Sequence, residues 1–145
     1  MLPTDVCEWL ESHRHAGYTS HVRANRARTL ETFNKLGIPE QSELAELYLN
    51  YGPAACRGWY DLCEADVLEQ VTEFAHRELG VPASFVALTS IEGQGVTLYD
   101  RNSGSVYDVS YGQFADLEAG RLSPLALSVG DFLRWCRLKD FTKQA

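Results

Sequence analysis

The carboxylates of Asp100 and Asp108 are the side chains of this sequence with the clearest potential for acid–base chemistry. They lie in residues 95–112, GVTLYDRNSGSVYDVSYG, where two runs of β-forming residues flank the turn-rich stretch DRNSG. Paired carboxylates can act as a general acid and a general base, so a small hydrolase is one hypothesis. Asp100 has a second role open to it, because an aspartate at a turn hydrogen-bonds the amide groups of that turn. We expect this structural role, and we predict that the protein is not an enzyme.

The histidines and cysteines form no pattern typical of a metal or nucleophile site. On a helix, side chains two residues apart such as His13 and His15 point about 200° apart and cannot share an ion. The four cysteines contain no C-x-x-C pair, which zinc ribbons and thioredoxin sites require. Cys56 and Cys63 could form a bridge, but reduced, partly buried thiols are expected in a cytoplasmic chain. Because no G-x-S-x-G, P-loop or H-E-x-x-H motif is present either, we predict no metal and no cofactor.

Capping residues and apolar spacing predict five helices, which together with the strands would position the Asp, His and Cys side chains. The helices cover about residues 4–15, 20–36, 39–50 and 64–80, and a last one begins after Ser128. Gly17 is expected to end the first helix and Gly37 the second. Helical spacing then predicts the core-facing residues, which are Val22, Ala27, Leu30 and Phe33, then Leu44, Leu47 and Tyr48, then Val67, Val71 and Phe74, and finally Phe132, Leu133, Trp135 and Cys136.

The strands are predicted at residues 84–91 and in the hairpin 95–111, with a further short strand at 57–62. A four-residue loop over 101–104 places Leu98 opposite Tyr107 and Val96 opposite Val109, which makes one face apolar throughout. The other face carries Thr97, Tyr99, Val106 and Asp108 and is expected to be open. Residues 113–127 are expected to form an irregular loop.

Length and composition favour a single soluble domain over residues 1–145. Apolar residues make up 45% of the chain and charged residues 23%, and no apolar run approaches the ~20 residues of a membrane span. The first residues do not resemble a signal peptide. We therefore expect a cytoplasmic α+β protein, with an antiparallel or mixed sheet and a central hairpin packed against several helices.

The net charge of −7 is concentrated in one segment of the chain. Residues 40–78 contain nine acidic residues against Arg57 and Arg77, a sum of −7. Such a surface repels nucleic acid, whose binding needs clustered Lys and Arg, and attracts a basic protein surface. Solubility alone also accounts for an acidic surface. We expect neither nucleic-acid nor membrane binding, and the oligomeric state stays open.

Aromatic residues gather around the predicted strands. Tyr and Trp are enriched in interfaces because they bury a large area at little entropic cost. Tyr107 and Trp59 are expected to pack within the fold. For Tyr99 and Tyr111, packing and an interface are both open alternatives.

Four motifs follow one another along the chain, namely TLETFNKLGIPEQSELAELYLNYGP, GWYDLCEADVLEQ, FVALTSIEGQGVTLYDRNSGSVYDV and LALSVGDFLRWC. In this order they resemble the SUKH superfamily, which includes many bacterial toxin-immunity proteins and fungal cell-wall regulators of the Smi/Knr type. The resemblance covers about residues 29–138 and leaves 1–28 as an N-terminal helical extension. It implies an α+β fold and a cytoplasmic immunity protein that neutralises a cognate toxin, often a nuclease or another nucleic-acid-modifying enzyme, by direct contact.

The residues predicted to contact this basic partner combine the acidic segment with the aromatic residues. They are Tyr60, Asp61, Glu64, Asp66, Glu69, Glu73, Tyr99 and Tyr111. The alternatives to an immunity protein are a cytoplasmic adaptor that binds a cellular client and the hydrolase described above.

Overall fold

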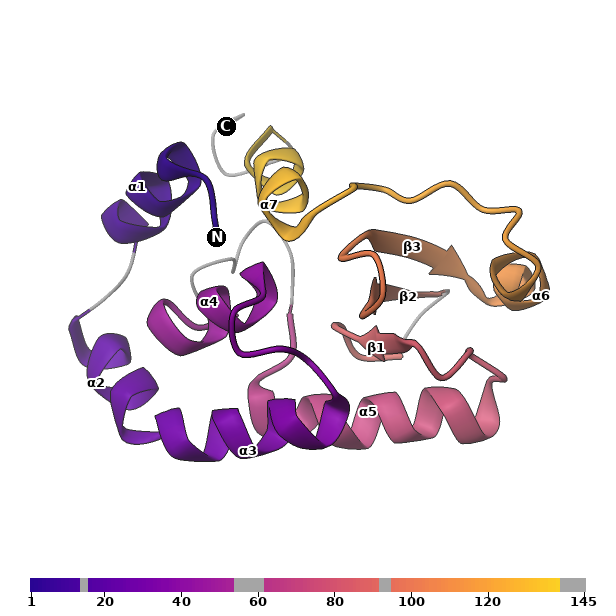
Figure 1. Cartoon of the computed structure of the whole chain (residues 1–145), viewed down its shortest axis with the longest axis horizontal. Helices are drawn as coiled ribbons and strands as arrows, with labels where there is room; N and C mark the ends of the chain where they lie inside the picture. Colours follow the sequence, from indigo (N-terminus) through magenta and orange to yellow (C-terminus); the bar gives the residue numbers. More distant parts are fainter. Residues whose placement is uncertain (14–15, 54–61, 92–94, 139–145) are drawn as a thin grey trace.

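Helices surround a small antiparallel sheet in the computed structural model, which describes residues 1–13, 16–53, 62–91 and 95–138 (Figure 1). The elements are α1 (Thr4–His13), α2 (Ala16–Ala24), α3 (Arg26–Leu36), α4 (Glu43–Asn50), α5 (Ala65–Glu78), β1 (Phe85–Ala87), β2 (Gly95–Asp100), β3 (Val106–Ser110), the 3₁₀ helix η2 (Tyr111–Gln113), α6 (Phe114–Glu118) and α7 (Val129–Leu138). The sheet has the strand order β1-β2-β3. The predicted α+β class is confirmed.

Helices α2 and α3 replace the single helix predicted over residues 20–36. Asn25 separates them with a non-helical ψ of 9°. The buried face of α3 includes Thr29, Thr32 and Phe33, whereas Ala27 is exposed and Leu30 is only partly buried. Gly17 lies within α2, so the prediction that it ends the first helix is wrong. One glycine costs a helix only about 1 kcal/mol, and α2 also packs against α4.

Helix α4 begins at Glu43 and not at Pro39 as predicted, because Ser42 is its N-cap residue. The Ser42 hydroxyl accepts a hydrogen bond from the Ala45 amide at 3.2 Å, and the first helical residue is Glu43. The predicted core residues Leu44, Leu47 and Tyr48 are all buried.

The register of the β2–β3 hairpin is the predicted one. Leu98 lies opposite Tyr107, and Val96 lies opposite Val109. The Asp100 carboxylate accepts hydrogen bonds from the Asn102 amide at 2.9 Å and from the Ser103 hydroxyl at 3.0 Å. Asp100 thus has the turn-forming role predicted for it.

Both faces of the sheet are covered, which the sequence did not predict. Val96, Leu98 and Val109 on one face form an apolar cluster with Ala75 of α5 and Leu117 of α6. On the other face, Tyr99 and Val106 belong to a larger cluster with residues of α1, α3, α4 and α7. The face expected to be open is therefore inside the protein, except at Asp108, which is exposed.

Strand β1 is shorter than the predicted strand 84–91. The Leu88 amide still donates to the Thr97 carbonyl at 2.8 Å, but the Thr97 amide donates to the Thr89 hydroxyl at 3.0 Å and not to a backbone carbonyl. At the opposite edge of the sheet, the backbone of Val106 pairs with Ala126. Of the strand predicted at 57–62, residues 57–61 lie outside the described part of the chain.

The first part of the chain after β3 is helical where an irregular loop was expected, whereas residues 119–127 form no helix, as predicted. Ser110 and Gln113 form a reciprocal capping box that starts η2, and α6 follows. The prediction for the last helix is confirmed, since the Asp131 amide donates to the Ser128 hydroxyl at 3.1 Å. Phe132, Leu133 and Cys136 are buried and Trp135 is partly buried.

The described cysteines are free thiols, namely Cys7, Cys63 and Cys136, while Cys56 lies outside the described residues. Within the described ranges, no helix combines the length and the apolar character needed to cross a membrane.

Candidate protein-binding surface

Helix α5 carries three of the eight residues predicted to contact a partner, Asp66, Glu69 and Glu73, and Glu64 directly precedes it. Its orientation is set by the edge of the sheet. The Thr72 hydroxyl accepts a hydrogen bond from the Ala87 amide at 3.0 Å. One turn later, His76 Nε2 lies 2.7 Å from the Phe85 carbonyl oxygen. A carbonyl only accepts hydrogen bonds, so Nε2 carries a proton. These two bonds satisfy polar groups of edge strand β1 that would otherwise be unpaired.

This orientation buries a different side of α5 from the one predicted. The buried residues are Leu68, Thr72 and Ala75. Val67 and Phe74, predicted to lie in the core, are 38% and 44% exposed, and Val71 is partly buried. The prediction is wrong because α5 has two sets of apolar residues at helical spacing, and only the set containing Leu68 brings Thr72 to the strand edge.

The acidic residues of α5 line two cavities between this helix and the α2–α3 segment. Glu64 and Asp66 border a cavity of about 440 Å³ together with Tyr18, His21 and Arg28. Glu69 and Glu73 border a second cavity of about 240 Å³. Figure 1 shows α3 and α5 along the same side of the molecule. The structure thus brings together the four predicted acidic residues that it describes.

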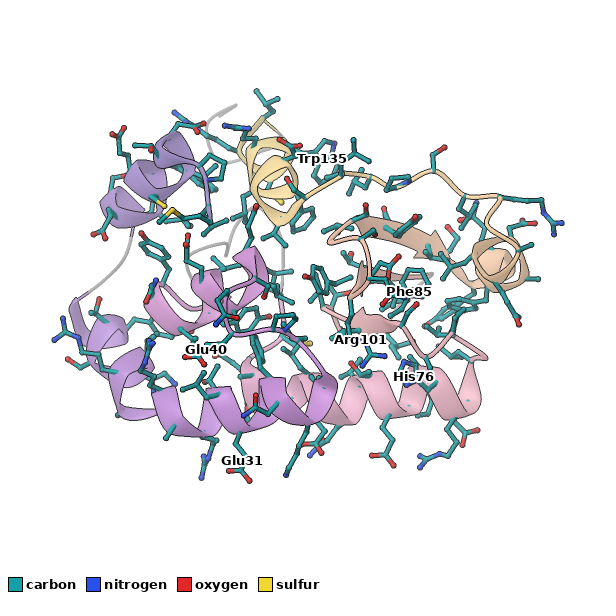
Figure 2. All side chains as sticks on the ribbon, viewed as in Figure 1. Glu31, Glu40, His76, Phe85, Arg101 and Trp135 are labelled. Atoms are coloured by element: carbon teal, nitrogen blue, oxygen red, sulfur yellow. The ribbon has the colours of Figure 1, made fainter. Side chains whose placement is uncertain are left out.

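Basic side chains of the same chain lie beside these carboxylates. Arg28 borders the larger cavity, and Lys35 and Arg101 border the smaller one. Figure 2 shows Arg101, His76 and Phe85 close together between the sheet and the helices. The acidic character of residues 40–78 is thus offset on this side by residues from elsewhere in the chain, which the sequence count over that segment did not reveal.

The four carboxylates differ in how available they are to a partner. Asp66 and Glu73 are exposed, and Glu69 is partly exposed. Glu73 pairs with Arg77 at 3.2 Å, an exposed ion pair that contributes little to stability. Glu64 is partly buried and accepts a hydrogen bond from the Tyr18 hydroxyl at 2.9 Å, so it holds α2 against the beginning of α5.

The two described tyrosines predicted as anchors have different surroundings. Tyr99 is only 4% exposed, and burial raises the pKa of its phenol. It cannot contact a partner in the folded protein, so this prediction is wrong. Tyr111 is exposed, and its hydroxyl donates to the Ile91 carbonyl at 2.6 Å. The other predicted residues, Tyr60 and Asp61, lie outside the described part of the chain.

Asp100 and Asp108 do not form a carboxylate pair. Asp108 lies opposite Thr97, and Asp100 is three residues beyond Thr97 on the same strand. Because successive side chains of a strand point to opposite faces, the two carboxylates lie on opposite faces of the sheet. This geometry gives the hydrolase hypothesis no support.

The His, Cys, Asp and Glu side chains of residues 1–13, 16–53, 62–91 and 95–138 include no group of three that could hold a metal ion. The features that remain on this side of the molecule are exposed carboxylates and exposed apolar side chains on one rigidly placed helix, a combination suited to protein binding.

No family model matches this chain, and neither a curated protein nor a solved structure matches it. The resemblance to the SUKH superfamily therefore rests on the four sequence motifs alone.

Proposed function

We propose that this protein is a cytoplasmic immunity protein that binds and neutralises a cognate toxin by direct contact. The observation that carries the proposal is that α5 exposes acidic residues, Asp66 and Glu73, beside exposed apolar residues, Val67 and Phe74. The four motifs that resemble the SUKH superfamily suggest the class of partner.

The charge of the protein suggests how neutralisation would work. An enzyme that acts on nucleic acid has a basic groove, because it must bind phosphates. A protein of net charge −7 can occupy such a groove and exclude the substrate, and complementary charge speeds the encounter. Neutralisation requires no chemistry from the immunity protein itself.

The direct test uses the product of the gene adjacent to that of this protein, since an immunity gene normally lies directly behind its toxin gene. We expect that product to arrest growth when expressed alone, and growth to recover when this protein is co-expressed. The two purified proteins should form a complex in size-exclusion chromatography. A harmless neighbouring product, or a toxic one that neither binds nor is neutralised, would refute the proposal, and capture of a housekeeping client would favour the adaptor.

Charge steering is tested by comparing Asp66→Lys with Glu8→Lys, which change the net charge equally. Asp66 lies on α5, whereas Glu8 is exposed on α1, away from α5 (Figure 1). At low salt, Asp66→Lys should slow association about threefold or more, and Glu8→Lys should have a much smaller effect. Equal association rates for the two variants would mean that the acids of α5 only keep the protein soluble.

A further inference from the structure

Three apolar residues of α5, the exposed Val67 and Phe74 and the partly buried Val71 between them, form a line that we call the α5 stripe. These positions are i, i+4 and i+7, so they follow one side of the helix over about 10 Å. Val67 is 38% exposed and Phe74 is 44% exposed. This is the spacing with which a helix inserts its apolar side chains into a groove of another protein.

The fold prevents the α5 stripe from turning inward. Turning α5 about its axis would break the bond between Thr72 and Ala87 and the bond between His76 and Phe85. It would also remove Leu68, which is 0% exposed, from the core. The exposure of the stripe is therefore a fixed property of the folded chain.

Charge decides which kind of protein covers the stripe. Exposed acidic residues flank it, with Asp66 next to Val67, Glu73 next to Phe74 and Glu78 one turn after Phe74. Arg77 pairs with both Glu73 and Glu78, so the three acids and this one base together carry a net charge of −2. Two copies of this chain meeting through the stripe would bring like charges together, which is unfavourable. An apolar groove with Lys and Arg at its rim matches both the stripe and its acidic border.

We infer that the toxin partner binds α5 through the α5 stripe, which enters an apolar groove with a basic rim on that partner. The inference rests on the proposed function, and it names the surface by which that function is carried out. Phe74 is the central anchor, because large aromatic residues contribute most to binding at such interfaces.

The test compares Val67→Ser and Phe74→Ser with Leu127→Ser, measured as binding kinetics against the product of the adjacent gene. Leu127 is the matched control, since it is an apolar residue that is 71% exposed but lies outside α5. We expect both stripe variants to melt within about 3 °C of the wild type, because exposed substitutions change stability little. Phe74→Ser should weaken binding at least tenfold, mainly through faster dissociation, and Leu127→Ser should bind like the wild type.

A second variant keeps the inference testable if a stripe variant does not fold. Gln70 is exposed on α5 between Val67 and Phe74, so Gln70→Lys removes no core contact and places a positive charge against the basic rim. It should weaken binding severalfold. Normal binding by this variant together with a folded Val67→Ser that binds normally would overturn the inference.

Failure of the inference can be told apart from failure of the proposed function. If the wild type neutralises the toxin and the stripe variants do so equally well, the inference is wrong and the function stands. If the wild type neither binds nor neutralises the neighbouring product, both fail. If sedimentation shows a dimer of this chain that Phe74→Ser abolishes, the stripe is a self-association surface and the inference is also overturned.

Discussion

The β2–β3 hairpin and helix α5 are both amphipathic elements, but the fold encloses one and leaves the other half exposed. The hairpin lies between two apolar clusters, so Tyr99, which belongs to the face expected to be open, is buried and only 4% exposed. Helix α5 closes the edge of the sheet with one side and presents Val67 and Phe74 to solvent with another. Residue type therefore does not decide burial here, since the polar Tyr99 of a strand is buried while the apolar Val67 and Phe74 of a helix are exposed.

Tyr99→Ala should show the largest effect, because it opens a cavity inside the covered hairpin. Loss of a buried aromatic side chain costs about 3–5 kcal/mol of unfolding free energy. Urea unfolding should show this loss, whereas the control Tyr111→Ala, which removes an exposed ring and one hydrogen bond, should cost about 1 kcal/mol. If Tyr99→Ala kept the stability of the wild type and only weakened partner binding, Tyr99 would lie at an interface and the contrast between hairpin and helix would be broken.

Neighbouring residues of α5 sharpen the contrast within one helix. Leu68 is 0% exposed and Val67 is 38% exposed. Leu68→Ala should therefore lower the free energy of unfolding by about 2–5 kcal/mol, and Val67→Ala by less than about 1 kcal/mol. Urea midpoints in parallel experiments measure both values. A larger cost for Val67→Ala than for Leu68→Ala would mean that Val67 faces the core, as the sequence pattern predicted.

Arg101 joins the hairpin to the end of α3 and to the segment before β1, and its removal should have an intermediate effect. Its guanidinium, at the tip of the hairpin, donates to the carbonyl oxygens of Leu36 at 2.8 Å, Ser84 at 3.3 Å and Ala83. Gly37 leaves room for it, since a Cβ atom there would lie 2.6 Å from Arg101 Nη1.

Arg101→Met should cost about 1–3 kcal/mol of unfolding free energy, because it leaves carbonyl groups without donors. The control is Arg121→Met, which breaks only an exposed ion pair with Asp116 and should cost less than about 1 kcal/mol. Equal urea midpoints for the two variants would mean that Arg101 does not hold the hairpin to the helices.

The core that covers Tyr99 should also respond to alkaline pH. Burial raises the pKa of the Cys136 thiol to about 12 from an ordinary value of 9.0. The folded protein thus retains this proton at pH values where the unfolded chain loses it, so the free energy of unfolding falls as the pH rises above about 9. At pH 10, Cys136 alone should lower it by about 1.4 kcal/mol relative to pH 7.

Urea unfolding of the wild type and of Cys136→Ala between pH 8 and pH 10.5 measures this contribution. The variant is expected to be less stable at every pH but to lose less stability as the pH rises. Parallel pH dependences in the two proteins would show that the thiol ionises as readily in the folded state as in the unfolded chain.

Local chemistry made some features predictable from the sequence alone. The hairpin register follows from Asp100, from Gly104, whose φ is +79°, and from the alternation of apolar residues. The start of α7 follows from the Ser128 cap. In each case the deciding interactions join residues a few positions apart, so the pattern that specifies the structure is contained in one short segment.

Only the tertiary structure decided which residues reach the surface. The burial of Tyr99 depends on helices that come from distant segments of the chain, and the bases beside the acids of α5 come from α3 and the hairpin. Helix α5 has two apolar sides. The buried side is the one that lets Thr72 and His76 form hydrogen bonds with backbone groups at the edge of β1. The sequence alone thus determined local geometry and total charge, while the exposure of Val67 and Phe74 was decided by unpaired polar groups of a strand that forms elsewhere in the chain.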